Sequence, residues 1–409
     1  MAYIPPHKRH SKDINTPQPT PSLFIPPSPS QHHRNSTQSF SGKIIYSRDS
    51  IHRWFVIPSN QSQGHDHDHH HHQEAKFQLK EFPHELIQRQ DGAKPFILLC
   101  NAMNESDASF TKSPWVCIEE RIRHDLIISI QNARMDMCKD GVELNLPRFI
   151  IRFGKVLFHG GPSISLDNVG ETNRVESLLS KMKNRYYTHV PDSFIKMLTH
   201  ETVPKCGLYS MEEKEYYQVK VFDKFRPNST ISCKCTLTAS SGELQMYKVE
   251  LNEVRQLVVD ISCLDKNVDL RLLLSSKRIL NSLTDEERHG LSSLVKSAVK
   301  DSEVKGGLRW PLGKESFGNR FSVVGIWHTK AKYFKSSNLR LKVRDADRFD
   351  FRTSTGEVTQ EASLKVPKLN KQLRDEALEP GSLVDVVADT LKLVWDNFLS
   401  WEGSFFDGQ

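Results

Sequence analysis

Residues 217–259 read YQVKVFDKFRPNSTISCKCTLTASSGELQMYKVELNEVRQLVV, and this stretch decides the fold class. Three runs in it are rich in β-branched and aromatic residues, at 217–225, 230–239 and 243–259. Ser241-Gly242 supplies a turn between the last two runs, and short turns of this kind join antiparallel strands. A further run follows at 268–274. The centre of the chain is therefore predicted to be an antiparallel sheet.

Outside this sheet, apolar residues recur at helical spacing. The expected helices cover 115–135, 171–185, 191–200, 284–300 and 382–400. The segment Thr284-Asp-Glu-Glu287 is a capping box, which predicts the start of one of them. Further strands are expected at 43–46 and 51–57 around a turn, at 76–79, at 146–159 as a bulged strand or a hairpin, and after Trp310. The predicted fold class is α+β, an antiparallel β-sheet with flanking amphipathic helices.

The N-terminal segment has a different composition. Eight of the twenty prolines fall within the first thirty residues, among Ser, Thr, Gln and His. Such a segment cannot bury enough apolar surface to offset its ordering entropy, so residues 1–41 are predicted to form a disordered tail. Residues 42–403 are predicted to form a single α+β domain, and a division into two subdomains near Gly207 is the alternative. A His-rich insertion at 61–73 is expected to be a loop between strands.

Composition also indicates in which cellular compartment the protein is expected. The seven cysteines are scattered without a Cys-x-x-Cys pair, so reduced and mostly buried thiols are expected rather than a disulfide framework. No apolar stretch approaches the roughly 18 residues that span a bilayer, and the first residues lack a hydrophobic signal core. We therefore expect a cytoplasmic or nuclear protein that does not associate with membranes. Nothing indicates the oligomeric state.

Two clusters contain potential metal ligands. Six imidazoles crowd the His-rich loop, at His65, His67, His69, His70, His71 and His72. A flexible loop does not hold ligands in a fixed geometry, so any metal binding there is expected to be adventitious. Cys233 and Cys235 share one face of a predicted strand, where core packing is the simpler interpretation. No metal site and no cofactor are predicted.

Catalytic motifs are missing from the sequence. It contains no Gly-x-Ser-x-Gly, no Walker loop and no His-Glu-x-x-His. Gly160-Gly161-Pro162-Ser163 follows a strand, but its proline removes an amide donor, and a plain loop is favoured. No catalytic residue is predicted, and a non-enzymatic role is the leading interpretation.

The net charge of +6 is concentrated in one stretch. Between Lys300 and Arg352 there are thirteen Lys or Arg residues against six Asp or Glu. Apolar residues at 339, 341 and 343 alternate there with cations, which gives one strand an apolar face and a cationic face. The residues predicted to contact nucleic acid are Arg340, Lys342, Arg344, Arg348 and Arg352. An ordinary solvated face, partly neutralised by neighbouring aspartates, is the alternative.

The same alternation permits a second arrangement. If the cationic face lined a closed antiparallel barrel, with Arg271, Lys248 and Glu250 on neighbouring strands, it could hold a polyphosphate. In this respect the chain resembles the triphosphate-tunnel enzymes. Those enzymes also carry Glu-x-Glu-x-Lys for a metal ion, whereas here Glu250 is followed by Leu251-Asn252. The resemblance therefore implies a phosphate-binding barrel without the metal-binding pattern.

Two further resemblances concern the chain's start and its length. The residues Tyr3, Ile4, Pro5, Pro6, His7 and Arg9 resemble a tail motif of some DEAD-box RNA helicases, Tyr-Ile/Val-Pro-Pro-His-x-Arg. That resemblance implies a partner protein of mRNA metabolism. The opening MAYIPPHKRHSK, with segments at 53–56, 152–160 and 264–271, resembles a family of uncharacterised plant proteins with a domain of unknown function.

These observations lead to two functional hypotheses. The first is a non-enzymatic interaction protein associated with RNA or ribonucleoproteins, whose tail recruits a partner and whose basic sheet face contacts RNA. The second is an enzyme or binder of a phosphorylated or polyphosphate ligand inside an antiparallel barrel.

Overall fold

The computed structural model describes residues 44–57, 76–83, 94–101, 112–137, 143–160, 164, 166, 169, 171–238 and 242–405. The residues from Phe40 to Gln409 form one compact unit. The tail at 1–41 and the His-rich loop at 61–73 lie outside the described residues, so the expectations for both stay predictions.

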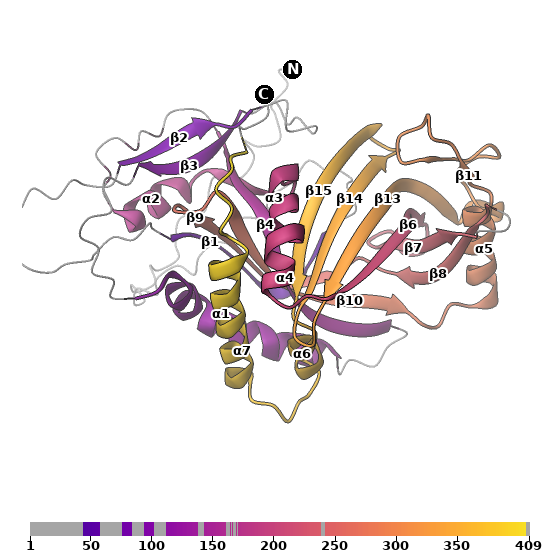
Figure 1. Ribbon diagram of the computed structural model, residues 1–409. Coiled ribbons are helices and arrows are strands. Elements are labelled where there is room, and N and C mark those ends of the chain that lie inside the picture. Colours follow the sequence, from indigo (N-terminus) through magenta and orange to yellow (C-terminus); the bar gives the residue numbers. More distant parts are fainter. Residues whose placement is uncertain are drawn as a thin grey trace, which may run out of the picture. The chain divides into compact units, whose positions relative to one another are not determined.

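The centre of the unit is a closed ring of antiparallel strands (Figure 1). Its members are β4 (Glu143–His159), β6 (Ser210–Asp223), β7 (Thr230–Leu237), β8 (Leu244–Glu250), β10 (Asp269–Leu280), β13 (Phe321–Lys335), β14 (Arg340–Asp350) and β15 (Thr355–Lys365). The ring runs β4-β10-β8-β7-β6-β13-β14-β15 and returns to β4. It closes because β10 pairs with β4 along its whole length, while β8 reaches β10 only at Glu250 and Ile279.

Two expectations about individual strands were wrong. The run at 243–259 is divided into β8 and β9 (Val254–Cys263), because the chain leaves β7 at Glu250 and then pairs with β10. The two strands expected at 43–46 and 51–57 are one strand, β1 (Ile45–Ile57), parallel to β9. The residues between Tyr46 and Ile51 form an irregularity in that pairing rather than a hairpin turn.

A smaller sheet adjoins the barrel. It contains β2 (Lys76–Glu81), β3 (Pro95–Asn101), the end of β4 and β5 (Lys183–Tyr187). The helix expected at 171–185 is shorter than predicted: α2 (Thr172–Leu179) gives way to β5, which pairs with β4. The segment at 146–159 is a single long strand that belongs to both sheets. At Gly154, where β4 passes from one sheet to the other, a Cβ atom would lie 2.0 Å from the carbonyl oxygen of Tyr187.

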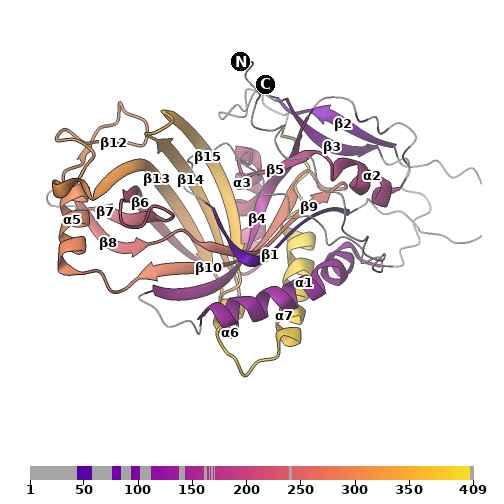
Figure 2. The ribbon, with the colours of Figure 1, turned by 180° about the vertical axis from the view of Figure 1, so that it is seen from behind.

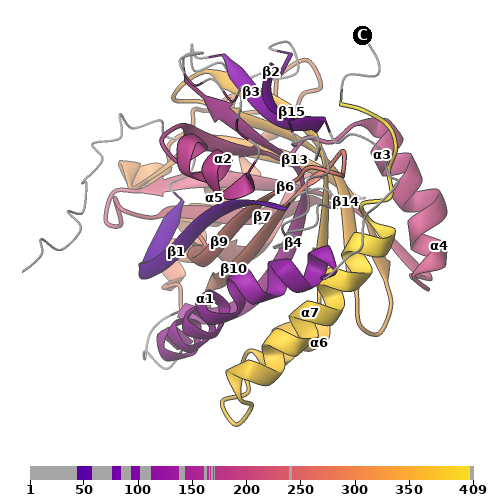
Figure 3. The same cartoon turned by 90° about the vertical axis from the view of Figure 1, so that its left-hand side faces the viewer.

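Helices cover the outer face of the strands. The helices α1 (Pro114–Met137) and α7 (Pro380–Asn397) lie side by side beneath β9 and β10, as Figure 3 shows. Further short helices are α3 (Asp192–Met197), a π-helical turn (Leu198–Thr202), α4 (Val203–Lys205) and α6 (Pro367–Gln372). Together with the apolar faces of β4, β9, β10, β14 and β15 they bury the largest hydrophobic core. Its members include Leu341 and Val343 of the alternating strand.

A separate core lies under α5 (Asp285–Lys296), at the other side of the barrel (Figure 2). The predicted capping box is confirmed: the Glu287 amide donates to Thr284 Oγ1 at 3.1 Å, and the Thr284 amide donates to Glu287 Oε2 at 3.0 Å. Cys233 and Cys235 are buried in this core, as expected. The short strands β11 (Val299–Lys300) and β12 (Leu308–Arg309) and a 3₁₀ turn (Phe317–Asn319) connect α5 to β13.

The α+β fold class with antiparallel sheet and flanking helices is confirmed. Among the described residues, no helix combines the length and the apolar character needed to cross a bilayer.

A cationic barrel interior as the candidate functional site

Strand alternation directs one face of each barrel strand inward. On β14, Leu341 and Val343 point outward into the main core, so Lys342 and Arg344 point inward. The pairing register carries the same face to its neighbours, since Lys342 lies opposite Tyr333 and Ser363, and Arg344 opposite Ala331 and Glu361. By this register the inward-facing charged residues are Arg148, Arg152, Glu212, Lys214, Lys220, Lys234, Lys248, Glu250, Arg271, Lys277, Lys335, Arg340, Lys342, Arg344, Arg348, Asp350, Glu357, Glu361 and Lys365.

This interior is not packed solid. The Arg344 and Arg348 side chains keep 19% and 18% of their surface accessible, and Lys234 and Lys277 keep 20% and 21%. All four are surrounded by strands, so the accessible surface faces the inside of the barrel. Water, or a ligand of similar thickness, can therefore reach them.

One carboxylate in the interior is held by arginines. Glu361 accepts hydrogen bonds from Arg344 Nε at 2.8 Å and from Arg348, and Thr359 Oγ1 donates to it at 3.1 Å. Burial alone would raise the pKa of Glu361, but Arg344 and Arg348 hold it well below its usual value. Glu361 is thus a permanently charged counter-ion, and its ion pairs fix the two guanidinium groups in place.

A second carboxylate is shared by three lysines. The amines of Lys277, Lys234 and Lys248 lie 2.6, 3.2 and 3.3 Å from the carboxylate of Glu250. Burial opposes the ionisation of Glu250, but Lys234 and Lys277 lower its pKa to about 2. A single carboxylate cannot neutralise three ammonium groups. Accordingly burial, with repulsion from Lys234, lowers the pKa of Lys277 to about 7.

Two more lysines in the same region have no carboxylate partner. Lys342 donates to the hydroxyl of Tyr216 at 2.9 Å, and within the described part of the chain neither Lys342 nor Lys365 forms an ion pair. Burial, with nearby Arg344 and Lys365, holds the pKa of Lys342 well below its usual value. Burial does the same to the pKa of Lys365, reinforced by Arg148, Lys277 and Lys234. We call Lys234, Lys277, Lys342 and Lys365 the lysine cluster.

A cavity of about 570 Å³ opens at the end of the barrel beside this cluster. It is formed by the start of β6, the end of β7 and the start of β8, and we call it the tyrosine mouth. Its lining residues are Glu213, Lys214, Glu215, Tyr216, Tyr217, Thr236, Leu237 and Tyr247. Tyr216 connects the mouth to the lysine cluster, because the Lys342 amine donates to its hydroxyl and the Lys234 amine lies 5.9 Å from its ring centroid.

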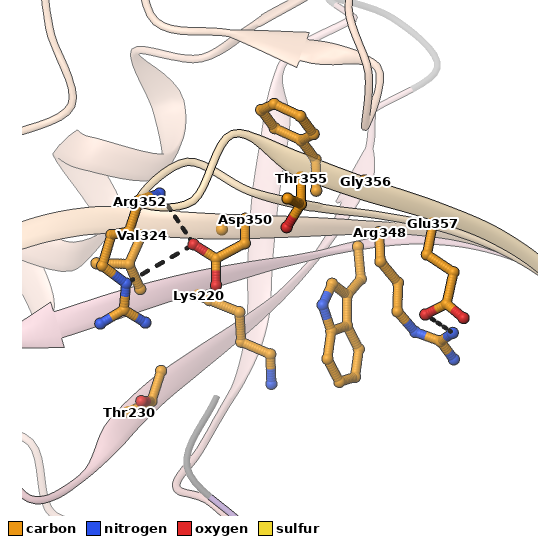
Figure 4. A pocket seen from close by; sticks show the side chains of 12 residues that line it. Lys220, Thr230, Val324, Arg348, Asp350, Arg352, Thr355, Gly356 and Glu357 are labelled. Atoms are coloured by element: carbon orange, nitrogen blue, oxygen red, sulfur yellow. Dashed lines mark hydrogen bonds and ion pairs between the residues drawn. The ribbon is translucent and has the colours of Figure 1, made fainter. Parts of the chain in front are cut away.

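The opposite end of the barrel holds a smaller cavity of about 70 Å³ (Figure 4). The Lys220 amine lies there, 4.2 Å from the ring centroid of Trp327 and 3.4 Å from Ser232 Oγ. Arg348 and Arg352 line the same cavity, and each lies 3.8 Å from a carboxylate, Glu357 and Asp350 respectively. Burial, with repulsion from Lys234, lowers the pKa of Lys220 to about 8. The cationic lining thus extends to this end of the barrel.

Sequence comparison places the chain in a family. The model described as "Domain of unknown function (DUF7903)" matches residues 38–398. The chain belongs to the DUF7903 family. This confirms the expected membership of a family with a domain of unknown function. No curated protein is significantly similar to the chain in sequence.

Several solved structures are weakly similar to this chain. The Pct1 RNA triphosphatase of S. pombe is 10% identical with a TM-score of 0.40, and the match covers 74% of this chain and 98% of that one. The mimivirus capping-enzyme triphosphatase is 9% identical with a TM-score of 0.24, over 61% and 94% of the two chains. A putative adenylate cyclase from Bacillus halodurans is 10% identical with a TM-score of 0.21, over 48% and 87%. Similarity this weak carries no functional inference.

The donor set of the DUF7903 barrel does not fit a divalent metal ion. The described residues include no group of three or more His, Cys, Asp or Glu side chains placed to share a metal. Glu250 is surrounded by lysines and Glu361 by arginines, so each carboxylate already has cationic partners. A hard divalent cation at either carboxylate would have to displace these ammonium or guanidinium groups.

The predicted site residues are thus only partly grouped together. Arg340, Lys342, Arg344 and Arg348 lie on the inward face of β14, and Arg352 lies at the smaller cavity. Of the residues named for the barrel alternative, Lys248 and Glu250 are paired, whereas Arg271 binds Asp260 at 2.6 and 2.7 Å. The tail residues Tyr3 to Arg9 lie outside the described residues.

Sequence reasoning missed several members of the site. These are Arg148, Arg152, Lys220, Lys234, Lys277, Glu361 and Lys365. Arg148, Arg152, Lys220 and Lys234 sit at alternate positions of the strands expected at 146–159, 217–225 and 230–239, which was a usable signal, whereas Lys277 lies beyond the run expected at 268–274. The pairing register that brings them together was not available from one sequence.

Proposed function

We propose that the barrel binds a phosphate-rich anion in its interior, at the lysine cluster. One observation carries this proposal: Lys234, Lys248 and Lys277 share a single carboxylate, Glu250, while Lys342 and Lys365 beside them have no ion pair among the described residues. Gathering like charges in a partly dehydrated interior is unfavourable unless an anion compensates them. A phosphate chain supplies several negative charges in a narrow, linear shape that enters a barrel end-on.

The chemistry of the site favours binding over metal-dependent hydrolysis. The carboxylates that would hold a divalent ion are already paired with cations, and the lysines themselves neutralise the ligand. We therefore propose that binding occurs without a divalent metal. In this arrangement Glu361 and its arginines form a rigid wall, and the lysines are the groups that contact the ligand.

The same geometry constrains the RNA hypothesis. Because the cations of β14 face inward, an RNA strand lying across the outside of the sheet does not reach them. Contact with RNA phosphates requires a chain end to enter the barrel. Recruitment of an mRNA-metabolism protein by Tyr3 to Arg9 stays a separate prediction.

Isothermal titration calorimetry with inorganic tripolyphosphate, in buffer containing EDTA, tests the proposal. The wild-type chain is expected to bind, and the double variant Lys342→Gln/Lys365→Gln is expected to lose at least tenfold in affinity, or about 1.4 kcal/mol. The matched control is Lys368→Gln/Lys371→Gln, which removes two exposed lysines of α6 and is expected to bind like wild type. Circular dichroism confirms that both variants are folded. Equal affinity in the two double variants, or no binding to wild type, refutes the proposal.

A further inference from the structure

The tyrosine mouth differs chemically from the interior that it leads to. The start of β6 carries Glu213 and Glu215, which would repel a phosphate chain held at this point. Their charges are already matched, since Glu213 lies 3.2 Å from the amine of Lys332 and Glu215 lies 2.7 Å from His328 Nε2. The Lys214 amine is likewise 2.6 Å from Glu212. The mouth therefore offers no unpaired cation to an anion, in contrast to the lysine cluster beneath it.

What the mouth offers instead is aromatic surface. Tyr247 on β8 is 55% exposed, and the largely buried Tyr216 and Tyr217, which are 8% and 1% exposed, line the same cavity beside it. Its volume of about 570 Å³ lies within the range of small-molecule sites, roughly 300 to 1,000 Å³. Burial, with the neighbouring Tyr216 and Glu250, raises the pKa of Tyr247 to about 12, so its phenol stays neutral. A neutral, half-exposed ring beside a cationic passage suits stacking with a planar group.

The two regions are directly connected. Lys342 binds the hydroxyl of Tyr216 and also belongs to the lysine cluster. A ligand with phosphates at the cluster therefore places its next chemical group against Tyr216 and Tyr247. A ligand made only of phosphates would leave this aromatic surface unused and would extend past the two glutamates.

We infer that the ligand carries an aromatic base next to its phosphates, as in a nucleoside 5′-triphosphate, with the base in the tyrosine mouth and the phosphates at the lysine cluster. This inference rests on the proposed function, and it adds the chemical class of the ligand. Free nucleotides and the 5′-triphosphate end of RNA share this chemistry.

Calorimetry with ATP and with inorganic tripolyphosphate, in EDTA, tests the inference. Stacking is expected to make ATP bind about tenfold more tightly than tripolyphosphate, although tripolyphosphate carries at least as much negative charge. Tyr247→Ala is expected to abolish this difference and leave tripolyphosphate binding unchanged, whereas Tyr247→Phe retains it. Tyr209→Ala, which removes an exposed tyrosine outside the mouth, is the matched control. Short RNAs with a 5′-triphosphate or a 5′-hydroxyl then distinguish the two sources of the ligand.

The outcomes distinguish a failure of the base site from a failure of phosphate binding. If both ligands bind equally, or if Tyr247→Ala weakens both alike, the base site is refuted while phosphate binding stands. If neither ligand binds, the proposed function itself fails. Equal and measurable binding of the two RNAs also overturns the inference, because it shows that the 5′-phosphates are not what the site holds. Binding of ATP but of neither RNA identifies free nucleotides as the source. Tighter binding of the triphosphorylated RNA than of ATP, or the reverse, supports it and identifies the source.

Discussion

Several lysines in the barrel have lowered pKa values because they are buried and lie close to other cations. Glu250 serves three lysines at once, so it cannot offset all of their positive charge. Burial, with repulsion from Lys234, lowers the pKa of Lys277 to about 7, and burial also lowers the pKa values of Lys342 and Lys365. A phosphate ligand would favour the charged form of these amines, so the protein would take up protons when the ligand binds.

Ligand affinity should therefore depend on pH. Because binding favours protonated Lys277, and because its pKa in the empty barrel is about 7, affinity is expected to be highest below pH 7 and to fall as pH rises to 8 or 9. Each unit above the pKa costs up to about tenfold for one lysine. Titrations at pH 6, 7, 8 and 9 with tripolyphosphate measure this.

The ligand's own ionisation also changes over this range, so Lys277→Gln is the necessary control. The ligand ionises in the same way when it is titrated into this variant, but the variant lacks the Lys277 amine. Its affinity should be lower at pH 6 and should fall less steeply than that of wild type. Parallel pH profiles for the two proteins would contradict the role given to Lys277.

At the level of secondary structure elements, the start of α5 is fixed by a reciprocal pair of hydrogen bonds. Thr284→Ala removes the hydroxyl that accepts from the Glu287 amide, and it is expected to lower the free energy of unfolding by about 1 kcal/mol. Thr284→Ser keeps the hydroxyl and should lose much less. Urea denaturation of the three proteins measures the difference. A loss shared equally by both variants would show that the methyl group, not the cap, matters.

A second prediction concerns Gly154, where β4 passes from one sheet to the other. Gly154→Ala would put a Cβ atom 2.0 Å from the backbone oxygen of Tyr187, so β4 and β5 would have to separate. A loss of several kcal/mol, on the order of 3, is expected from such overpacking. Gly381→Ala is the control, because nothing lies within 4 Å of its Cβ position near the start of α7. That substitution should be neutral or slightly stabilising. Similar unfolding midpoints for the two variants would contradict the steric argument.

The sequence predicts an element well when the pattern that defines it lies among residues close together in the chain. The capping box and the alternation of β14 are local, and both are confirmed. The pairing of β10 with β4 joins residues more than a hundred positions apart, and no period in the sequence reports it. For that reason the basic face of β14 could be described from sequence, while its position inside a closed ring remained one of two alternatives. Likewise, the kink at residues 251–253 follows from a change of partner strand, which is not a local property.

For the molecule as a whole, the lysines of the barrel interior repel one another, and the proposed anionic ligand would relieve this repulsion. A ligand that binds only the folded state stabilises it by about 2.7 kcal/mol at a concentration of 100 times its Kd. Tripolyphosphate is therefore expected to raise the thermal unfolding midpoint of the wild-type chain. Lys342→Gln/Lys365→Gln should unfold at the same or a higher temperature without ligand, because it contains less repulsion, and it should gain little from the ligand. Scanning fluorimetry measures both effects.

Potassium chloride at matched ionic strength is the control for screening, which also reduces repulsion between like charges. An equal shift with the chloride salt would mean that no specific phosphate site is needed to explain the stabilisation. A lower midpoint for the unliganded double variant would show that these lysines contribute packing rather than strain.

Because β4 belongs to both sheets, insertions and deletions within this strand have a predictable effect on the fold. On one face of the strand Arg148 and Arg152 line the wet barrel, and beyond Gly154 the same face supplies Val156 and Phe158 to the core of the small sheet. Removing a single codon between them would turn every later side chain to the opposite side, and because residues 153–158 are buried on both faces, side chains that fit one core would have to pack in the other. An insertion or deletion between Arg148 and Phe158 is therefore expected to destabilise the fold, because it would change which side chains face the barrel and which face the small sheet.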